Sequence, residues 1–586
     1  MSGRLSLSWV HQDRALLCDG SGGYSWVDRD DPRLAEVRLL AETGRVGDVT
    51  GGPRDNLLIQ GDCRDAWRAL VRIPEWASAY RGAAKLVYLD PPFNTGQTFA
   101  QYDDGLDHSI WLAMIRERLL LARELLAPDG SLWVHLDDAE SAYCKVLLDE
   151  IFGRSSFVAT VVWEKDRGRR NDTDLSSAHD YLHVYAPSGP GWRTVRNLLP
   201  RTALVDGRYR NPDGDPRGPW LQGDNGTAKS GTERNRFAVE LPSGRVVRPP
   251  AGSYWRFSPA TLHAARADGR VWFGRGGDSL PVIKRYRHEV QPGLVPRTWW
   301  PAEEVGTNQD AKRDHLRRLF PGTEPFATPK PEPLLRRIIE IATDAGDLVV
   351  DGFAGSGTTA AVAHKLGRRW VAVEQSAATV TGFTLPRLRM VVDGADPGGI
   401  TRDSRAEPVA PLPDGLTPAD VAAARRTVAA LAGARLLDGV GDEALGTLHR
   451  RLLSAARSRE RVVREWPGGG GFRTLAVTPA RYEVTGGRVL LDALPAEFVA
   501  AQLGFRLAPR GPFAGVRGRN RLAVVDGVVD ERLASAAVTA LRPDETVTIV
   551  GRAVLPGTAA HLRALRPGSR VLKAPDDLLR HRRVLR

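Results

Sequence analysis

The sequence predicts a mixed α/β fold in which one central sheet is interrupted by a long inserted segment. Strands and helices alternate between residues 56 and 186, and the same alternation resumes between residues 333 and 373. The residues between these segments, up to about 325, are rich in Pro, Gly and Trp and hold neither pattern for long. Because alternating strands and helices are typical of parallel sheets, we expect the two outer segments to build one sheet.

The first outer segment contains a clear helix between short apolar runs. Apolar residues at spacings of three and four predict this helix over residues 109–126, and Ala-Pro-Asp-Gly follows it as a stop signal. The apolar runs around the helix are too short for helices and predict strands. The predicted strands are 57–59, 86–89, 132–134, 157–163 and 181–185.

The second outer segment repeats the alternation, and the C-terminal part changes character. Helices are expected at 333–342 and 358–366, and strands at 348–350 and 370–373. After a Pro-rich linker the apolar spacing from 417 to 464 is helical. The last hundred residues then predict a small βαβαβ unit, with strands at 522–525, 547–550 and 571–572 and helices at 530–541 and 558–565.

Composition narrows the class of protein. The chain is 42% hydrophobic and 26% charged, as expected of a globular protein. It contains no apolar run of about 18 residues and its N-terminus has no signal-peptide pattern, so we expect a cytoplasmic protein without membrane contact. Three cysteines are too few for a disulfide framework, and no Cys/His spacing suits zinc, so no metal site is expected.

Basic charge is concentrated in the inserted segment. Residues 191–320 contain 23 Lys and Arg against 13 Asp and Glu, so this stretch supplies ten of the net twelve positive charges. A localised excess favours a polyanionic partner, although an Arg-rich coding bias is the alternative. Candidate phosphate or base contacts are Arg208, Arg210, Arg217, Arg234, Arg236, Lys284, Arg285 and Arg287, and the tryptophans expected to form the core of the insert are Trp220, Trp255, Trp272, Trp299 and Trp300.

A glycine-rich turn follows the predicted strand 348–350. Gly355-Ser356-Gly357 separates this strand from a helix, and the acidic Glu374 closes the next strand 19 residues after Gly355. Such a turn lets the backbone approach a ligand closely, and the acid can bind the hydroxyls of an adenosine ribose. The pattern fits nicotinamide, flavin and S-adenosylmethionine enzymes alike, and a purely structural turn is the remaining alternative.

A second motif, Asp90-Pro91-Pro92-Phe93, follows the predicted strand 86–89. Two prolines remove two N–H donors and hold their carbonyls rigidly. The Asp90 carboxylate and the Pro91 carbonyl could accept the hydrogens of an aromatic amine, while the Phe93 ring offers a flat surface to an extruded base. The alternative is a Pro-Pro turn with an incidental aromatic residue.

These motifs together resemble the amino-methyltransferases of restriction-modification systems in which Asp-Pro-Pro-Tyr/Phe precedes Phe-x-Gly-x-Gly. The chain is most similar to the modification subunits of type III systems. The resemblance covers most of residues 50–400. Further stretches that carry it are 56–62, 102–111, 308–312, 326–331 and 468–473.

The resemblance implies a site-specific DNA methyltransferase that transfers a methyl group from S-adenosyl-L-methionine to N6 of a flipped adenine in double-stranded DNA. Asp90, Pro91, Pro92 and Phe93 would then be catalytic, although many relatives have Tyr where this chain has Phe93. Glu374 would hold the ribose and Asp62 the adenine of the cofactor. The other implied cofactor contacts are Thr328, Lys330, Asp351, Phe353, Gly355, Ser356, Gly357 and Thr358.

The resemblance also implies a domain order and partners. The fold would be a permuted Rossmann-like methyltransferase sheet with an inserted target-recognition domain and a C-terminal helical plus small α/β region. A homodimer and a separate restriction subunit with helicase and nuclease activity are expected. The implied parts are an N-terminal extension (1–50), the two methyltransferase halves (51–190 and 326–400), the inserted DNA target-recognition domain (191–325), a helical linker (401–470) and the small α/β domain (471–586).

Other functions stay open at the level of sequence. Methylation of cytosine N4 uses the same amine chemistry, although enzymes with that target usually carry Ser-Pro-Pro. Methylation of cytosine C5 is disfavoured because it needs a nucleophilic cysteine, typically after proline, and none of the three cysteines follows proline. An RNA adenine methyltransferase, a non-catalytic DNA-binding subunit and a nicotinamide oxidoreductase remain alternatives.

Overall fold

The computed structural model describes two compact units. The larger unit comprises Met1–Asn197, Arg297–Asp403 and Val463–Arg586, and the smaller one comprises Leu198–Pro296 and Ser404–Val462. The described residues are 6–18, 23–95, 107–169, 171, 173–201, 206–221, 226–324, 326–409, 411–412, 418–437, 439–485 and 488–578. None of the described helices combines the length and apolarity that a bilayer crossing requires.

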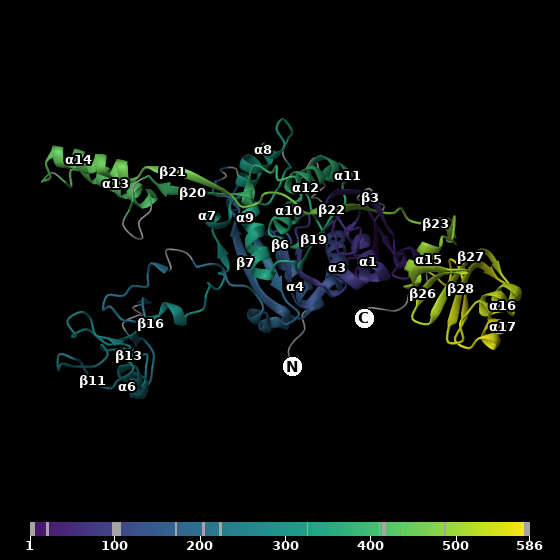
Figure 1. Cartoon of the computed structure of the whole chain (residues 1–586), viewed down its shortest axis with the longest axis horizontal. Coiled ribbons are helices and arrows are strands. Elements are labelled where there is room, and N and C mark those ends of the chain that lie inside the picture. The colour runs from purple at the N-terminus through teal and green to yellow at the C-terminus, as the bar shows by residue number, and fades with distance from the viewer. Residues whose placement is uncertain are drawn as a thin grey trace. The chain divides into compact units, whose positions relative to one another are not determined.

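The larger unit is built on a ten-stranded sheet in the order β17-β7-β8-β6-β5-β18-β19-β4-β22-β3 (Figure 1). Most of its strands are apolar runs that are buried on both faces, as expected for a parallel sheet covered by helices. In sheet order they are β17 (Trp299–Trp300), β7 (Phe157–Glu164), β8 (His179–Tyr185), β6 (Leu126–Leu136), β5 (Ala84–Leu89), β18 (Leu348–Asp351), β19 (Arg369–Glu374), β4 (Asn56–Gln60), β22 (Gly471–Val477) and β3 (Leu40–Gly47).

The direction of the chain reverses between β5 and β18. These two strands are parallel neighbours, with Val87 opposite Val350 and Tyr88 opposite Asp351. From β5 the chain continues to β6 on one side, and from β18 it continues to β19 on the other. In an open α/β sheet, ligands bind beyond the carboxyl ends of strands at such a switch point. The predicted fold class is therefore confirmed, and Asp90 and Asp351 lie at the expected place.

Helices cover both faces of the sheet because parallel connections are right-handed. The connections that run from β4 towards β7 place four helices on one face, where α1 packs against α2 and α3. These helices are α1 (Cys63–Arg72), α2 (Pro74–Tyr80), α3 (His108–Leu125) and α4 (Ser141–Phe152). The opposite direction after β18 places α10 (Thr358–Lys365) and α12 (Leu385–Val392) on the other face, with α9 (Glu332–Ala342) packed on α10 (Figure 1).

Short elements complete this part of the larger unit. Two β-ladders, β1–β2 and β23–β24, stand apart from the main sheet, and a π-helical turn over Asp310–Leu316 precedes α8. The bounds are β1 (Ala15–Cys18), β2 (Tyr24–Val27), β23 (Tyr482–Thr485), β24 (Arg488–Leu491), α7 (Ala302–Val305), α8 (Arg317–Leu319) and α11 (Ala377–Thr379).

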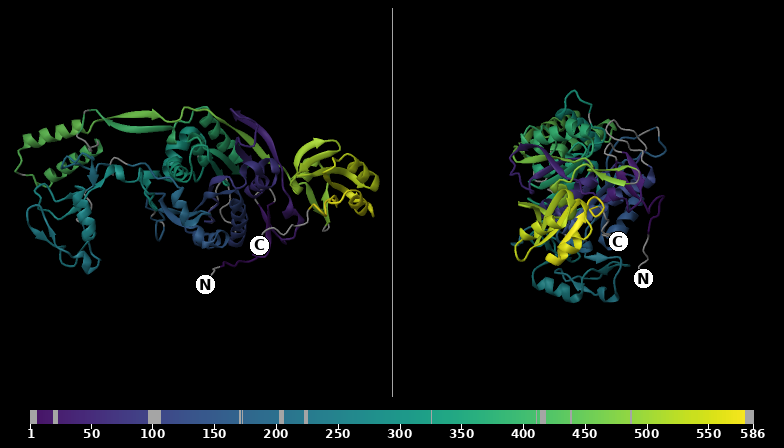
Figure 2. Two further views of the ribbon diagram at one scale, coloured as in Figure 1. Left: turned by 60° about the horizontal axis from the view of Figure 1, so that its bottom comes forward. Right: turned by 90° about the vertical axis from the view of Figure 1, so that its right-hand side faces the viewer.

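The C-terminal residues form a five-stranded sheet in the order β25-β26-β27-β28-β29, drawn in yellow-green to yellow in Figure 2. Its last three strands are parallel and connected by helices, which confirms the predicted βαβαβ unit. An antiparallel hairpin that the sequence did not predict extends the sheet. The elements are α15 (Ala496–Leu503), β25 (Arg506–Arg510), β26 (Phe513–Arg517), β27 (Asn520–Val529), α16 (Glu531–Thr539), β28 (Thr546–Val554), α17 (Thr558–Leu565) and β29 (Arg570–Lys573).

Three predicted segments differ from the structure. The strands β22 and β3 pair with each other and extend the main sheet, whereas the sequence placed them in the C-terminal domain and the N-terminal extension. The helical pattern from 417 to 464 forms α13 (Pro418–Gly433) and α14 (Asp442–Ala455), but it ends in the strand β21 (Ser458–Arg464), which pairs with β20 (Arg402–Pro408). The six-part division of the chain remains a proposal.

The inserted residues of the smaller unit form short two-stranded ladders and the helix α6 (Pro259–Ala267), as the loop-rich pattern predicted. Trp255 and Phe257 stack at 5.6 Å in its core. The ladders are β9 (Trp220–Leu221) with β16 (Arg285–Tyr286), β10 (Thr227–Ala228) with β13 (Tyr254–Trp255), β11 (Val239–Glu240) with β12 (Val246–Val247), and β14 (Val271–Trp272) with β15 (Val282–Ile283).

Some side chains of the insert were assigned wrongly from the sequence. Trp299 is 46% exposed, and Trp300 is buried in the main sheet of the larger unit rather than in the insert. Lys284 is buried and forms ion pairs with Asp213 and with Asp215, the latter at 2.7 Å. Since its charge is neutralised inside the insert, Lys284 is a structural residue and is not available to a phosphate.

Candidate functional site

A cavity of about 1160 Å³ opens at the carboxyl ends of β5 and β18 in the larger unit. Ligand sites commonly measure about 300–1000 Å³, so this cavity has room for two ligands side by side. It is lined by all but two of the site residues that the sequence predicted. Those that line it are Asp90, Pro91, Pro92, Phe93, Thr328, Lys330, Asp351, Phe353, Gly355, Ser356, Thr358 and Glu374.

The turn Gly355-Ser356-Gly357 has, at both glycines, a backbone conformation that residues with a side chain rarely adopt. Gly355 and Gly357 have φ angles of 49° and 80°. A Cβ atom on Gly355 would lie 3.2 Å from the Phe326 ring, and one on Gly357 would lie 3.1 Å from Thr384. Gly357 does not line the cavity, but it begins α10 and so sets the direction of the turn.

Glu374 ties the end of β19 to this turn. Its carboxylate accepts hydrogen bonds from the backbone N–H of Gly355 and from that of Ser376, each at 2.9 Å. Burial raises the pKa of Glu374, while these backbone hydrogen bonds lower it. The carboxylate faces the cavity from the side of the sheet that the glycine turn occupies.

Asp351, the last residue of β18, is buried at the base of the cavity. Its carboxylate accepts a hydrogen bond from the N–H of Phe353 at 2.9 Å. Burial raises the pKa of Asp351 to about 7, and the nearby carboxylates of Asp90 and Glu374 add to the increase. A cationic ligand in the cavity would favour the charged form of this group.

The Asp-Pro-Pro-Phe corner follows β5 on the other side of the switch point. The indole N–H of Trp111 donates to the Pro92 carbonyl at 2.7 Å, which fixes the corner against α3. The Phe93 ring faces the imidazole of His135, with ring centroids 5.7 Å apart. The aromatic face and the Asp90 carboxylate therefore belong to one rigid element.

The two oxygens of Asp90 have different surroundings. Oδ2 pairs with the ammonium of Lys330 at 2.8 Å, and the same ammonium lies 5.0 Å from the centre of the Phe93 ring. Oδ1 is buried and has no hydrogen-bond partner among the described residues. A buried acceptor without a partner is costly, so this oxygen is suited to a donor group of a ligand.

The structure does not bring Asp62 to the cavity wall. Its carboxylate caps α1 by accepting a hydrogen bond from the N–H of Arg64 at 2.8 Å, and it pairs with the guanidinium of Arg118 at 2.5 Å. Arg118 does line the cavity. The contact with the cofactor's adenine that the resemblance implies for Asp62 stays a prediction.

Several residues of the cavity wall were not predicted as site residues. Lys165, at the end of β7, pairs with Asp180 at 2.6 Å, and Asp180 also contacts His135 at 3.2 Å. Asn308 and Gln309 lie before the π-helical turn and complete this side of the wall. The sequence pointed to the stretch 308–312 only through the family resemblance, because no spacing rule links these residues to β7.

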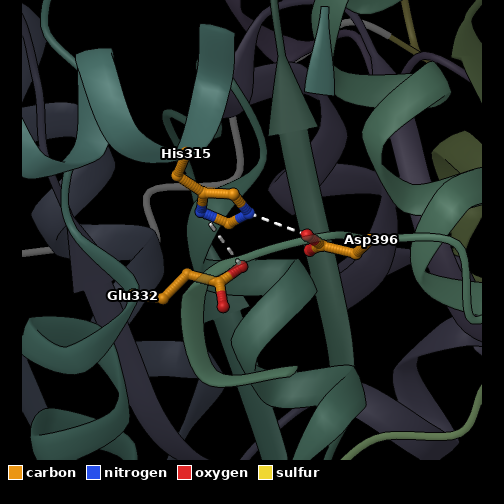
Figure 3. Close-up of side chains that lie close together, drawn as sticks. All are labelled: His315, Glu332 and Asp396. Carbon is orange, nitrogen blue, oxygen red and sulfur yellow. Dashed lines mark hydrogen bonds and ion pairs between the residues drawn. The ribbon is translucent and has the colours of Figure 1, made fainter. Parts of the chain in front are cut away.

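A buried cluster of charged residues lies behind the glycine turn. His315, Glu332 and Asp396 point toward one another from three elements, with ligand-type atoms within 4.8 Å (Figure 3). All four carboxylate oxygens already accept hydrogen bonds from protein groups, chiefly from Lys365 at 2.6–2.8 Å and from Arg387 at 2.9 Å. Because two fixed cations already neutralise the two carboxylates, this donor set does not suit a divalent metal ion.

Comparison with known proteins gives the family. The sequence profile described as DNA methylase matches residues 84–383, slightly more than half of the chain. The chain is 32% identical over 339 residues to the type III restriction-modification enzyme StyLTI Mod subunit of Salmonella typhimurium, covering 52% of this chain and 49% of that protein. It is 26% identical over 437 residues to the EcoP15I Mod subunit of Escherichia coli, covering 62% and 65%.

Solved structures are similar at low identity. One of them, the putative DNA modification methylase TTHA0409 of Thermus thermophilus in complex with S-adenosyl-L-methionine, is 16% identical, covers 56% of this chain and 92% of its own, and has a TM-score of 0.28. The chain spans about half the length of the Salmonella relative. The match of the family profile runs from β5 to the π-helical turn Val380–Thr384, and so includes both motifs that line the cavity. The chain belongs to the DNA methylase family.

Proposed function

We propose that this protein transfers a methyl group from S-adenosyl-L-methionine to N6 of an adenine in double-stranded DNA. One observation carries the proposal: the Asp-Pro-Pro-Phe corner and the glycine turn, which lie far apart in the sequence, line one cavity at the reversal point of the sheet. The first motif suits a base amine and the second suits an adenosine-containing cofactor. Transfer between them needs both groups within one enclosed space.

The residues of the β18–β19 half fit the cofactor. Glu374 accepts two backbone N–H groups and keeps further lone pairs that suit ribose hydroxyls. Asp351 suits the positive charges of the methionine part, since its pKa near 7 would fall beside a cation. When bound, S-adenosyl-L-methionine supplies an electrophilic methyl group on a sulfonium.

The residues of the β5 half fit the base. Asp90 Oδ1 is available to accept a hydrogen from the amine, and the Lys330 ion pair fixes the orientation of the carboxylate. The Pro92 carbonyl is already occupied by Trp111, so the Pro91 carbonyl is the second acceptor that the corner can offer. The Phe93 ring gives the base a surface for stacking.

This arrangement favours direct transfer to an amine over methylation of cytosine C5. The C5 reaction needs a thiolate nucleophile, and Cys63 is the cysteine that lines the cavity. Burial raises the pKa of the Cys63 thiol well above its ordinary value, so the thiolate is disfavoured. An exocyclic amine is attacked without a covalent enzyme intermediate, which fits a site built from acceptors and an aromatic ring.

The inserted residues are the proposed DNA-binding part. A groove of about 520 Å³ in the smaller unit is lined by Arg201, Arg217, Arg287 and His288. Extrusion of a base costs a few kcal/mol, which contacts with DNA phosphates would offset. Since the substrate is DNA, the cytoplasm is the proposed compartment. By analogy with the type III relatives, we further propose a homodimer that acts with a separate restriction subunit.

The proposal is tested by incubating the purified protein with S-adenosyl-L-methionine and unmethylated phage DNA. The DNA is hydrolysed to nucleosides, which mass spectrometry separates and identifies. We expect N6-methyladenine, and long-read sequencing of the same DNA then gives the recognition sequence. N4-methylcytosine would support the alternative amine target. In a parallel incubation with RNA, methylation of RNA alone would support an RNA enzyme, and no methylated product with either substrate would contradict a catalytic role.

A further inference from the structure

Asn308 presents an unused amide to the cavity. Its side-chain oxygen Oδ1 is buried and has no hydrogen-bond partner among the described residues, and the residue lines the same cavity as Asp90. Of the buried acceptor oxygens left without a partner in the described residues, only Asp90 Oδ1 and Asn308 Oδ1 belong to residues of this cavity. Both oxygens can therefore accept a hydrogen bond from a ligand.

The backbone around Asn308 is anchored without help from its side chain. The Trp163 indole N–H donates to the Gly306 carbonyl at 3.0 Å, and the Asn308 N–H donates to the Lys165 carbonyl at 3.1 Å. Thr307 is held by Asp310, whose carboxylate accepts from its N–H at 2.7 Å. Since the local fold is complete without the amide, the amide is not explained by a structural role.

The anchoring also places Asn308 on the base side of the cavity. It is attached to the end of β7, and β7, β8 and β6 lie on the far side of β5 from the cofactor strands β18 and β19. Lys165, which holds its N–H, pairs with Asp180, and Asp180 contacts His135, whose ring faces Phe93. Asn308 is thus connected to the stacking surface and not to the glycine turn.

We propose that Asn308 determines base specificity by pairing with the edge of the extruded adenine. An amide carries an acceptor and a donor side by side, which matches the N6 amine and N7 of adenine. Cytosine has a carbon in the place of N7, so it cannot pair with both ends of the amide. Asn308 Oδ1 and the Pro91 carbonyl share one hydrogen of the amine, the Asn308 NH2 group donates to N7, and Asp90 Oδ1 accepts the other hydrogen. This inference rests on the proposed function and assigns a residue that the Asp-Pro-Pro-Phe motif does not contain.

The test compares Asn308→Ala and the isosteric Asn308→Asp with the wild-type protein on unmethylated phage DNA. Asn308→Asp keeps an acceptor oxygen but loses the donor. A bidentate amide pair discriminates between bases by about 5- to 150-fold. We therefore expect kcat/KM for DNA to fall by that factor in each variant. The ratio of N4-methylcytosine to N6-methyladenine in the product should rise. Binding of S-adenosyl-L-methionine should stay within about twofold.

Three controls keep the inference falsifiable. Thermal melting shows whether each variant folds, and Glu303→Gln, at a carboxylate that is 69% exposed, controls for a surface change. Once the recognition sequence is known, 7-deazaadenine at the target position should reduce the difference between wild type and Asn308→Ala, because it lacks the paired N7, whereas 1-deazaadenine should leave that difference unchanged.

Wild-type rate and product ratio in Asn308→Ala would overturn the inference, as would a parallel loss of cofactor binding. Failure of the wild-type protein to methylate DNA would instead overturn the proposed function, so the two failures are distinguishable.

Discussion

Replacing Glu374 by Gln tests the cofactor half of the site. The carboxylate accepts two backbone hydrogen bonds at 2.9 Å, from Gly355 and Ser376. Glutamine has nearly the same shape but offers a single acceptor oxygen, and its NH2 group would face one of the two N–H donors. At least one charge-assisted hydrogen bond, to the turn or to the ribose, is therefore removed.

The expected size follows from that single hydrogen bond. Hydrogen bonds to charged groups contribute about 1.5–3 kcal/mol, which corresponds to a rise of about 13- to 160-fold in Kd. Isothermal titration calorimetry with S-adenosyl-L-methionine measures this Kd for wild type and Glu374→Gln. Glu303→Gln, at an exposed ion pair, serves as the control and should bind as the wild type does.

A loss of cofactor binding is distinguished from a loss of folding by thermal melting. Thermal melting should show both variants folded, because Glu374 lies at a strand end and not in the apolar core. A Kd for Glu374→Gln within twofold of the wild-type value, in a folded protein, would refute the role given to this carboxylate. Loss of affinity for DNA with unchanged affinity for the cofactor would refute it as well.

Three further changes follow from the charges of the structure. Burial raises the pKa of Asp351 from 3.8 to about 7, so its contribution to stability is fully present below pH 3.8 and is lost as the pH rises through 7. Asp351→Asn should therefore raise the Tm relative to wild type at pH 8 but not at pH 4. Scanning fluorimetry measures both, and a Tm difference that does not depend on pH would argue against this. Lys365→Met should destabilise the protein by about 3–5 kcal/mol in chemical denaturation, because the buried carboxylates of Glu332 and Asp396 then lack a neutralising cation. A chelator should leave the stability of the wild type unchanged. Equal denaturation midpoints for Lys365→Met and wild type would contradict the role given to these ion pairs. The double variant Arg201→Ala, Arg287→Ala should weaken the salt dependence of binding to non-specific duplex DNA. The slope of the logarithm of the binding constant against the logarithm of the salt concentration should change by about 0.9 for each phosphate that is no longer neutralised. Equal slopes for the variant and the wild type would show that the groove does not contact DNA.

The sequence predicted the elements that local patterns determine. The apolar run before Asp90 and the run before Asp351 each have the length of a buried strand, and the rule for parallel sheets places their carboxyl ends at one edge. Both strands are found as predicted, and they are direct neighbours. The glycine turn was likewise recognisable, because its backbone requires residues without a side chain at Gly355 and Gly357.

The parts that escaped prediction depend on interactions between distant residues. β22 pairs with β3, which lies more than 420 residues away, and the residues of neither strand indicate which strand it pairs with. Lys284 resembled the other basic residues of the insert until its pairing with Asp213 and Asp215 became visible.

The site shows the same limit. The pairing of Lys330 with Asp90 joins two motifs that the sequence could only assign separately, one to the cofactor and one to the base.

The proposed methyl transfer depends most directly on Asp90. Asp90→Asn keeps the shape of the corner and the Phe93 ring but replaces one carboxylate oxygen by an NH2 group. The remaining oxygen should stay beside the Lys330 ammonium, so the NH2 group takes the place of Oδ1 and cannot accept a hydrogen from the amine. The decisive measurement is the single-turnover rate of N6-methyladenine formation by Asp90→Asn and wild type, with cofactor binding measured in parallel. We predict a loss of at least about 100-fold in rate with unchanged Kd for S-adenosyl-L-methionine. Methylation by Asp90→Asn at the wild-type rate would contradict the account.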